Sequence, residues 1–292
     1  MHRTFINKSY STILSATKLA GINAKTIRSA SFSKPVELHK RNWKENVVYL
    51  YQFKRTPVIP NLSPFCLKVE TFLRAYNIKY EAMPTWTIRS KEGKLPFIEL
   101  NGKQIADSQF IFFYLMKNFK IDEGLSAEQA AIARSVDRMI EGSTHHALTY
   151  FRNVENAHNV LNPNISGLPL PSFVINLFLL KRFKTTVLNR LKSEGTARHP
   201  RDAIIEILRR DIQALDGILG DKKFFMGIVP TTPDFTAFGH LATAYYLPFQ
   251  QPITSLVDEE FPRIQNFLER MRTHYWVAQK SGFFDILRPE NF

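Results

Sequence analysis

The chain of 292 residues has very little of three features that would each have indicated a class of protein. It has one cysteine, Cys66, which excludes an intramolecular disulfide framework and a cysteine-based structural zinc site. No stretch reaches the roughly 18 consecutive apolar residues that a membrane-spanning helix needs. Residues 168–180 come nearest, but they contain Pro169 and Pro171. The sequence therefore predicts no transmembrane span.

Acidic residues are absent from the first 36 positions, where Ser and Thr are frequent. Residues 1–45 hold nine Lys or Arg and two acids, a net charge of +7, which leaves +6 of the total +13 for the other 247 residues. Such a composition is typical of a mitochondrial transit peptide, and residues 11–25 predict an amphipathic helix. A disordered basic tail is the other interpretation. We expect a mitochondrial protein, with a cytoplasmic or membrane-associated protein as the alternative.

The rest of the chain carries no pattern of a nucleic-acid or metal-binding protein. Its cations are not gathered with interleaved aromatic residues, so nucleic-acid binding is not predicted. The histidines His145, His146 and His240 lack the spacing of metal ligands, and we expect them to serve packing or the surface. No metal is predicted. A hydrophobic content of 44% is enough to bury a sizeable core.

The order of predicted elements changes near residue 122. Residues 46–122 predict a thioredoxin-like domain with the order β-α-β-loop-β-β-α: strands over 47–53, 80–83, 96–100 and 103–106, and helices over 64–75 and 109–119. Asn101-Gly102 is a strong hairpin signal. Residues 123–292 predict an all-helical domain with helices over 127–151, 172–193, 200–219, 232–247 and 261–273.

Three short motifs follow one another at spacings that suit a thiol-peptide site. Ser63 begins a helix in residues 63–66 (SPFC), where its hydroxyl can stabilise a sulfur anion. Pro96 begins a strand, where a cis bond would leave the backbone of Leu95 free to pair with a ligand. Asp107 and Ser108 offer a carboxylate and a hydroxyl at a second helix start. The order and spacing indicate a thioredoxin-like fold that holds a thiol peptide such as glutathione.

A thioredoxin-like domain followed by a helical domain is the architecture of glutathione transferases. Thr231 and Asp234 predict the capping box that those proteins carry in their helical domain. The segments VVYLYQF, SPFCLKVETFLRAYNIKYE, KLPFIELNG, ADSQFI, GTARH and DFTAFGHLA resemble the failed-axon-connections family, which is related to the metaxins of the mitochondrial outer membrane. The resemblance covers most of the body and none of residues 1–45.

The resemblance implies a role for each site residue. Ser63 matches the catalytic Ser of several glutathione transferase classes and would stabilise the thiolate. Leu95 and Pro96 would hold the cysteinyl part of glutathione, and Asp107 and Ser108 its γ-glutamyl end. Plain helix caps at Ser63 and Asp107 are the structural alternative.

Two other conspicuous features receive no catalytic role. Ser63 stands where a Cys-x-x-Cys motif has its attacking thiol, so a dithiol reaction is excluded and Cys66 is expected to be a packed small residue. Arg198-His199 resembles part of a family signature and has no nearby partner in sequence for catalysis.

Three hypotheses of function remain open at this stage. The first is a glutathione transferase in which Ser63 activates glutathione towards an electrophile. The second is a non-enzymatic adaptor with the same fold, which binds a second copy or a protein partner at a membrane. The third is a membrane-surface protein that attaches through residues 168–182.

Overall fold

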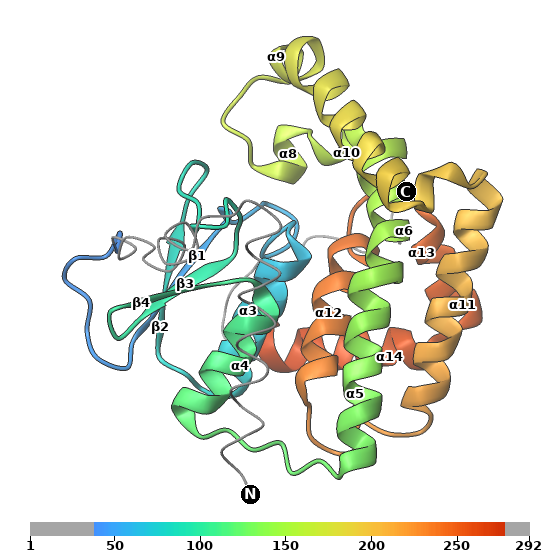
Figure 1. Ribbon diagram of the computed structural model, residues 1–292. Coiled ribbons are helices and arrows are strands. Elements are labelled where there is room, and N and C mark those ends of the chain that lie inside the picture. Colours follow the sequence, from blue (N-terminus) through green and yellow to red (C-terminus); the bar gives the residue numbers. More distant parts are fainter. Residues whose placement is uncertain (1–37, 278–292) are drawn as a thin grey trace, which may run out of the picture. The chain divides into compact units, whose positions relative to one another are not determined.

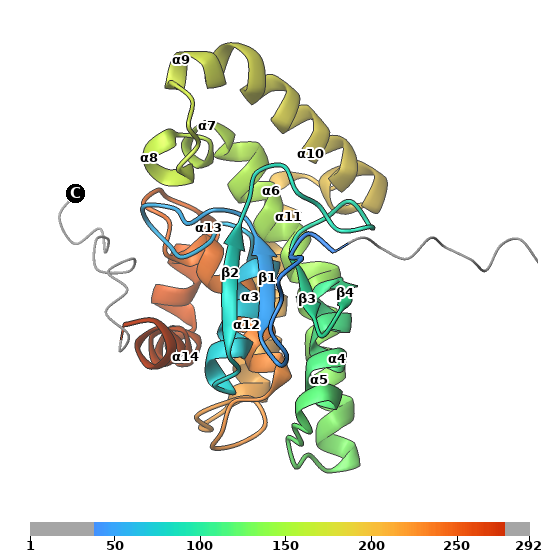
Figure 2. The same cartoon turned by 90° about the vertical axis from the view of Figure 1, so that its left-hand side faces the viewer.

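The computed structural model describes residues 38–277, which begin with a four-stranded mixed sheet. Its strands are β1 (Val48–Gln52), β2 (Tyr80–Pro84), β3 (Phe97–Leu100) and β4 (Lys103–Ala106), in the spatial order β2-β1-β3-β4. β1 is parallel to β2 and antiparallel to β3, and β3 is antiparallel to β4. Two helices, α3 (Pro64–Ala75) and α4 (Ser108–Phe119), lie between this sheet and the helical part of the chain (Figures 1 and 2). The predicted order of elements is confirmed.

Local sequence accounts for the turns of this sheet. α3 is the crossover that a parallel β1–β2 pair requires. Asn101 and Gly102 join β3 to β4 with φ angles of 48° and 77°, the left-handed pair that a two-residue hairpin turn needs. The cap of α4 is Asp107, one of the two residues expected there, and its carboxylate accepts hydrogen bonds from the N–H groups of Gln109 and Phe110.

The second part of the described chain is helical. Its elements are α5 (Ala127–Met139), α6 (His145–Tyr150), α7 (Ala157–Val160), α8 (Pro163–Ser166), α9 (Ser172–Val174), α10 (Leu180–Glu194), α11 (Arg201–Leu219), α12 (Thr232–Tyr245), α13 (Pro252–Ser255) and α14 (Pro262–Arg272), with π-helical turns at Ile140–Thr144, Phe151–Glu155, Ile175–Leu179, Leu256–Glu260 and Thr273–Val277 and a 3-10 turn at Thr196–Arg198. The predicted helix over 127–151 is a longer run with two π turns. The connection between the predicted helices over 127–151 and 172–193 contains two short helices, α7 and α8.

Helix α12 lies at the centre of the helical part and packs directly on α3 (Figure 1). Residues 233–244 of α12 are all buried. At Gly239 the two helices approach so closely that an added Cβ would lie 2.7 Å from the carbonyl oxygen of Pro64 and 2.8 Å from the Cβ of Lys68. The predicted box at its start is present, because Asp234 accepts a hydrogen bond from the N–H of Thr231 at 2.8 Å. These contacts join the helical part firmly to α3.

The predictions for residues 1–37 lie outside the residues that the structure describes, including the helix over 11–25 and most of the basic segment 1–45. The described residues from Lys40 onward belong to one compact unit. Within residues 38–277, no helix is long and apolar enough to cross a membrane. The predicted boundary at residue 122 falls in the link between α4 and α5 and stays a prediction.

Candidate functional site

A pocket of about 650 Å³ lies where the start of α4 meets the start of β3. Four predicted site residues line it: Leu95, Pro96, Asp107 and Ser108. Its remaining lining residues are Phe65, Ser90, Lys91, Glu92, Lys94, Gln104, Ile105, Ala106 and Phe110. Residues that lie up to 45 positions apart in sequence, from Phe65 to Phe110, thus meet in one cavity.

The backbone at Leu95 is arranged for pairing with an extended ligand. The Leu95–Pro96 peptide bond is cis, which confirms that prediction. Among the described residues, neither the N–H nor the C=O of Leu95 has a hydrogen-bond partner. Since backbone polar groups at a buried residue are nearly always paired, these two groups are available to a bound peptide.

Asp107 and Ser108 present two different groups to the same pocket. Asp107 Oδ1 accepts from the N–H of Gln109 at 2.9 Å and from that of Phe110 at 3.3 Å. The backbone of Asp107 has φ 72° and ψ 129°, a sparsely populated conformation for a residue with a side chain. The buried Ser108 hydroxyl has no hydrogen-bond partner in the part of the chain that the structure describes.

Ser63 lies apart from this lining, at the first turn of α3. It is half-buried and caps the helix, and its Oγ accepts a hydrogen bond from the N–H of Cys66 at 3.4 Å. Phe65, two residues later, does line the pocket. The structure therefore brings four of the five predicted residues into one cavity and places the fifth at the helix start beside it.

Cys66 is fully buried on the side of α3 that packs against the sheet. Its side chain is 0% exposed and packs with Tyr49, Tyr51 and Phe97. Burial raises the pKa of the Cys66 thiol to about 12, so the thiolate is not formed near neutral pH. The expectation of a packed small residue agrees with this environment.

Arg152 is a buried cation behind Ser63 that the sequence did not lead us to predict. The guanidinium of Arg152 donates from Nη1 to the carbonyl oxygens of Leu62, at 3.1 Å, and Thr243, at 2.9 Å. Burial lowers the pKa of Arg152 to about 10, which leaves it charged at neutral pH. No carboxylate forms an ion pair with it within residues 38–277. An uncompensated positive charge therefore lies next to the residue that precedes Ser63.

Two histidines pack on Phe65, with ring centroids 5.1 Å away for His145 and 5.0 Å for His240. His240 Nδ1 donates to the carbonyl oxygen of Thr236 at 2.9 Å. Burial lowers the pKa of His240 to about 3. Burial, followed by repulsion between the protonated forms of His145 and His240 and by the charge of Arg152, lowers the pKa of His145 well below its ordinary value. Both rings are neutral at pH 7 and act as aromatic packing, as the sequence suggested.

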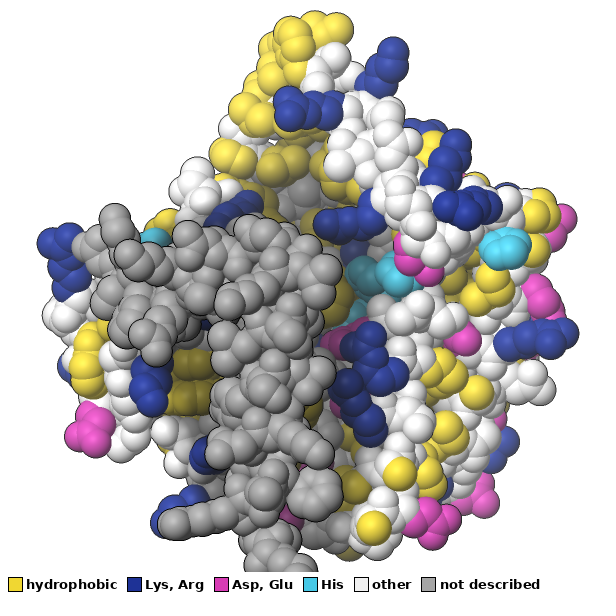
Figure 3. Space-filling view, in the orientation of Figure 1, with side chains coloured by type: hydrophobic (Ala, Val, Ile, Leu, Met, Phe, Trp, Pro, Cys, Tyr) yellow, Lys and Arg dark blue, Asp and Glu magenta, His cyan; other side chains and the backbone are white. Residues whose placement is uncertain are grey.

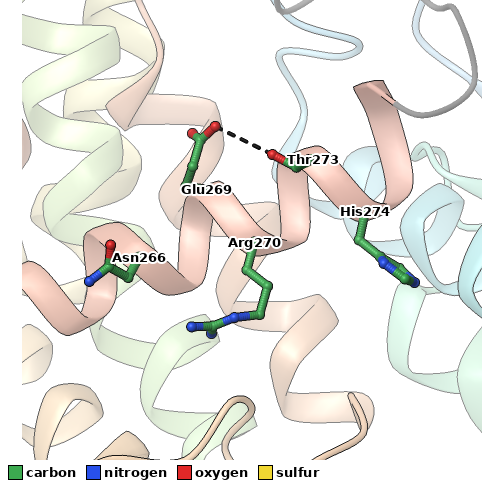
Figure 4. A pocket seen from close by; sticks show the side chains of 5 residues that line it. All are labelled: Asn266, Glu269, Arg270, Thr273 and His274. Atoms are coloured by element: carbon green, nitrogen blue, oxygen red, sulfur yellow. Dashed lines mark hydrogen bonds between the residues drawn. The ribbon is translucent and has the colours of Figure 1, made fainter.

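A second surface groove, of about 420 Å³, lies on α14 and carries no comparable chemistry (Figure 4). Figure 4 shows its side chains pointing to different sides of the helix: Glu269 accepts from Thr273 Oγ1 at 3.4 Å, whereas Arg270 points away and donates to the carbonyl oxygen of Lys223.

Two other candidate features have no site around them. Arg198, from the segment that resembles a family signature, makes a structural contact, since its Nε donates to the carbonyl oxygen of Lys192 at 2.7 Å. Among the described residues, no group of three or more His, Cys, Asp or Glu side chains could hold a metal ion.

Comparison with known families agrees with this geometry. A family model of the glutathione S-transferase N-terminal domain matches residues 64–158, and one of the glutathione S-transferase C-terminal domain matches residues 208–271. The chain belongs to the glutathione S-transferase superfamily. Within it, the chain is 37% identical to Failed axon connections of Drosophila melanogaster over 250 residues, which cover 80% of this chain and 59% of the fly protein.

Two more distant relatives have names of different kinds, one a metaxin and the other an enzyme. Human Metaxin-2 is 23% identical over 82% of this chain and 92% of its own length. The isoprene-epoxide glutathione S-transferase of Rhodococcus sp. (strain AD45) is 28% identical over 74% of this chain and 94% of the bacterial enzyme. This superfamily member is thus a glutathione S-transferase-like protein of the group that holds Failed axon connections and the metaxins.

Solved structures show the same fold. The β-etherase LigF from Sphingobium sp. strain SYK-6 has a TM-score of 0.57 at 14% identity, covering 80% of this chain and 97% of the etherase. The apo form of human glutathione S-transferase T1-1 has a TM-score of 0.53 at 15% identity, covering 84% of this chain and 93% of the human protein. The thioredoxin-like and helical architecture predicted from the sequence is confirmed.

Proposed function

We propose that the protein binds glutathione in the pocket between α4 and β3 and stabilises the thiolate at the start of α3. One observation carries the proposal: Leu95, Pro96, Asp107 and Ser108, chosen from separate motifs, line a single cavity. The unpaired backbone of Leu95 and the unpaired hydroxyl of Ser108 supply the hydrogen-bonding groups that a tripeptide needs.

Each end of glutathione meets a group of matching charge in this arrangement. The cysteinyl amide and carbonyl pair with the backbone of Leu95 in the manner of a β-strand. The γ-glutamyl carboxylate lies at the N-terminus of α4 against the Ser108 hydroxyl, and its ammonium group faces the carboxylate of Asp107. The glycyl carboxylate lies towards Lys91 and Lys94, which line the pocket.

The sulfur then lies at the first turn of α3, where two positive fields act. The helix N-terminus contributes about 0.3–1 kcal/mol in exposed geometry. Arg152 adds a charge without a carboxylate partner behind Leu62. A free thiol has a pKa of about 8.5, so these fields and the Ser63 hydroxyl favour the anion that attacks an electrophile.

Thermal-shift titration of the full chain with glutathione tests binding without knowledge of the electrophile, because a ligand stabilises the state that binds it. We expect Ser108→Ala to abolish most of the shift. Ser135→Ala is the matched control, because Ser135 is an exposed serine on α5, outside the pocket lining. Ophthalmic acid, which lacks the sulfur, should bind with similar affinity. A parent protein without any shift at millimolar glutathione would remove the proposal.

A non-enzymatic adaptor is the second candidate, and an exposed aromatic pair on α4 favours it. Phe110 and Phe113 lie with ring centroids 6.2 Å apart and remain largely exposed. Such a face suits a second copy or a protein partner. Sedimentation velocity of the parent and of Phe113→Asp decides this: the adaptor predicts an assembly that the substitution dissociates, with glutathione binding unchanged.

We place the protein at mitochondria in either case. The proposal is supported by the acid-poor basic segment 1–45 and by the relationship to proteins named metaxins. A fluorescent reporter fused to residues 1–45 should accumulate in mitochondria. Diffuse cytosolic fluorescence would contradict the targeting role and leave glutathione binding untouched.

A further inference from the structure

One end of the helical part carries large apolar side chains that nothing in the described chain covers. Phe173 is 71% exposed, Leu177 70% and Phe178 66%, and Leu170 just before them is 38% exposed. These four residues, called the apolar tip below, come from α9, the following π turn and the link before α9. Figures 1 and 2 show this region projecting away from the sheet, and Figure 3 shows its apolar surface with cations beside it.

The apolar tip is held outward by its own helix. Ile175, within the π turn between Phe173 and Leu177, is 2% exposed and faces the protein. Phe173 and Leu177 each lie two residues from Ile175 and hence on the opposite side of the helix, so turning them inward would expose Ile175. The exposure is therefore a fixed property of this helix.

The charge around the apolar tip has one sign. No acid occurs between Glu155 and Glu194, whereas five Lys or Arg do. Lys181, Arg182 and Lys184 follow the tip directly and are exposed. Within residues 38–277 none of these three has an ion pair or hydrogen bond, in contrast to exposed Arg209, which pairs with Glu260 at 3.1 Å.

We propose that the apolar tip inserts into the interfacial layer of an anionic membrane, with Lys181, Arg182 and Lys184 at the lipid phosphates. Aromatic and aliphatic side chains on one face with Lys and Arg beside them are the pattern of interfacial helices. Basic side chains next to the insertion point are attracted by anionic headgroups. The apolar stretch is too short to span, so the protein lies on the membrane surface.

The shape of the region favours a membrane over a protein partner. A stable protein interface buries about 800 Å² on each side, with an apolar centre inside a polar rim. Four side chains at a projecting end offer a far smaller and convex contact. Insertion between lipids needs only such a projection, and it does not depend on whether the pocket holds glutathione.

Vesicle co-sedimentation of the full chain tests the proposal. With phosphatidylcholine vesicles that contain about 30% phosphatidylserine, we expect F173S/L177S/F178S to bind at least about tenfold more weakly than the parent. The matched control is I228S/V229S, which removes two other exposed apolar residues far from the tip in sequence, and it should bind as the parent does. K181E/R182E should weaken binding and reduce its dependence on salt. Residues 1–45 are unchanged in every variant, so their charge cancels in each comparison.

A reporter at the tip separates insertion from simple attraction. Phe178→Trp should show a blue-shifted emission that brominated lipids quench, measured as the difference from the parent protein, whereas Ile228→Trp should not. Equal vesicle binding of F173S/L177S/F178S and the parent would overturn the proposal. So would an unquenched Trp at position 178. Loss of a dimer in the triple variant with vesicle binding unchanged would assign the tip to a protein interface instead.

Discussion

Ser63 and Cys66 lie three residues apart on α3 and have opposite environments. The serine is half-buried at the helix N-terminus, where the helix dipole and the charge of Arg152 favour an anion. The cysteine is fully buried, and its pKa is raised by that burial. In the proposed function, the reactive sulfur at this helix is therefore that of glutathione and not that of Cys66.

Ser63→Ala should raise the pKa of glutathione bound to the protein by about one unit, because the hydroxyl donor to the sulfur is removed. It should also cost about 1 kcal/mol of stability through loss of the cap. Ultraviolet absorbance of the thiolate during a pH titration measures the first effect, and urea denaturation the second. Ser63→Asp separates them, since it retains the cap without donating to an anion. An unchanged thiol pKa in Ser63→Ala would show that Ser63 is a cap alone.

Gly239→Ala should destabilise the protein by about 2 kcal/mol or more, because the new Cβ would collide with the backbone of Pro64 and with Lys68. Gly217→Ala on α11 is the matched control. A Cβ there meets nothing within 4 Å, so the substitution should stabilise the helix by up to about 1 kcal/mol. Chemical denaturation measures both. Equal effects of the two substitutions would contradict the close approach of α3 and α12.

At the scale of the element, the sequence predicted what local chemistry determines. The Ser63-Pro64 start of α3, the Asn101-Gly102 turn and the box at Thr231 are where they were expected. The π turn at Ile140–Thr144 was not predicted, because it inserts a residue into a helix whose local propensity is unremarkable.

The contacts that join distant segments were also beyond sequence reasoning. Arg55 pairs with buried Glu70, 15 residues away, and Lys68 Nζ lies 2.8 Å from Glu141 Oε1, 73 residues away. Such pairs depend on which helix faces meet, which periodicity does not specify. Arg152 was not predicted as part of the site for the same reason, because its position depends on how the helices pack.

Lys68→Met should cost about 1–3 kcal/mol, because the buried carboxylate of Glu141 then keeps only the more exposed Arg138, at 3.2 Å, as its partner. Adding Glu141→Gln should restore part of the loss. The exposed pair Arg209–Glu260 supplies the control cycle, with a coupling of less than about 1 kcal/mol. A double-mutant cycle by urea denaturation gives both couplings. Equal values for the two pairs would mean that burial does not strengthen the Lys68 interaction.

At the scale of the whole molecule, two buried groups make opposite contributions to the pH dependence of stability between pH 6.5 and 5. Burial raises the pKa of Asp234 to about 7, so the folded protein holds a proton there that the unfolded chain has lost, and this contribution favours folding as the pH falls. His240 acts in the opposite direction. The pKa of His240 is about 3 in the folded protein because of burial, against an ordinary value of 6.5. Between these two values the unfolded chain binds more protons at this histidine, so the contribution of His240 to stability decreases as the pH falls from 6.5. The slope is at most about 1.4 kcal/mol per pH unit for each such group. His145, whose pKa is lowered for the same reason, adds to it.

His240→Gln should reduce the slope of unfolding free energy between pH 6.5 and 5, measured by urea denaturation at each pH. His199→Gln, at an exposed histidine, should leave it unchanged. At lower pH a second loss of folding stability should appear, which comes from Glu70. Burial alone would raise the pKa of Glu70, but hydrogen bonds from Arg55 and Gln52 lower it, so its contribution is lost only below its ordinary value of 4.5. Equal slopes for the parent and His240→Gln between pH 6.5 and 5 would contradict a neutral, buried His240.

The burial of Cys66 has a further consequence for a protein that would work in the presence of millimolar thiol. With no other sulfhydryl in the sequence, oxidised glutathione or a thiol-selective reagent has no accessible sulfhydryl on the native molecule. Any mixed disulfide or covalent adduct at sulfur must form while the first turns of α3 are detached from the sheet. The rate at which a thiol reagent labels the Cys66 sulfur therefore measures how often α3 opens, and no introduced probe is needed.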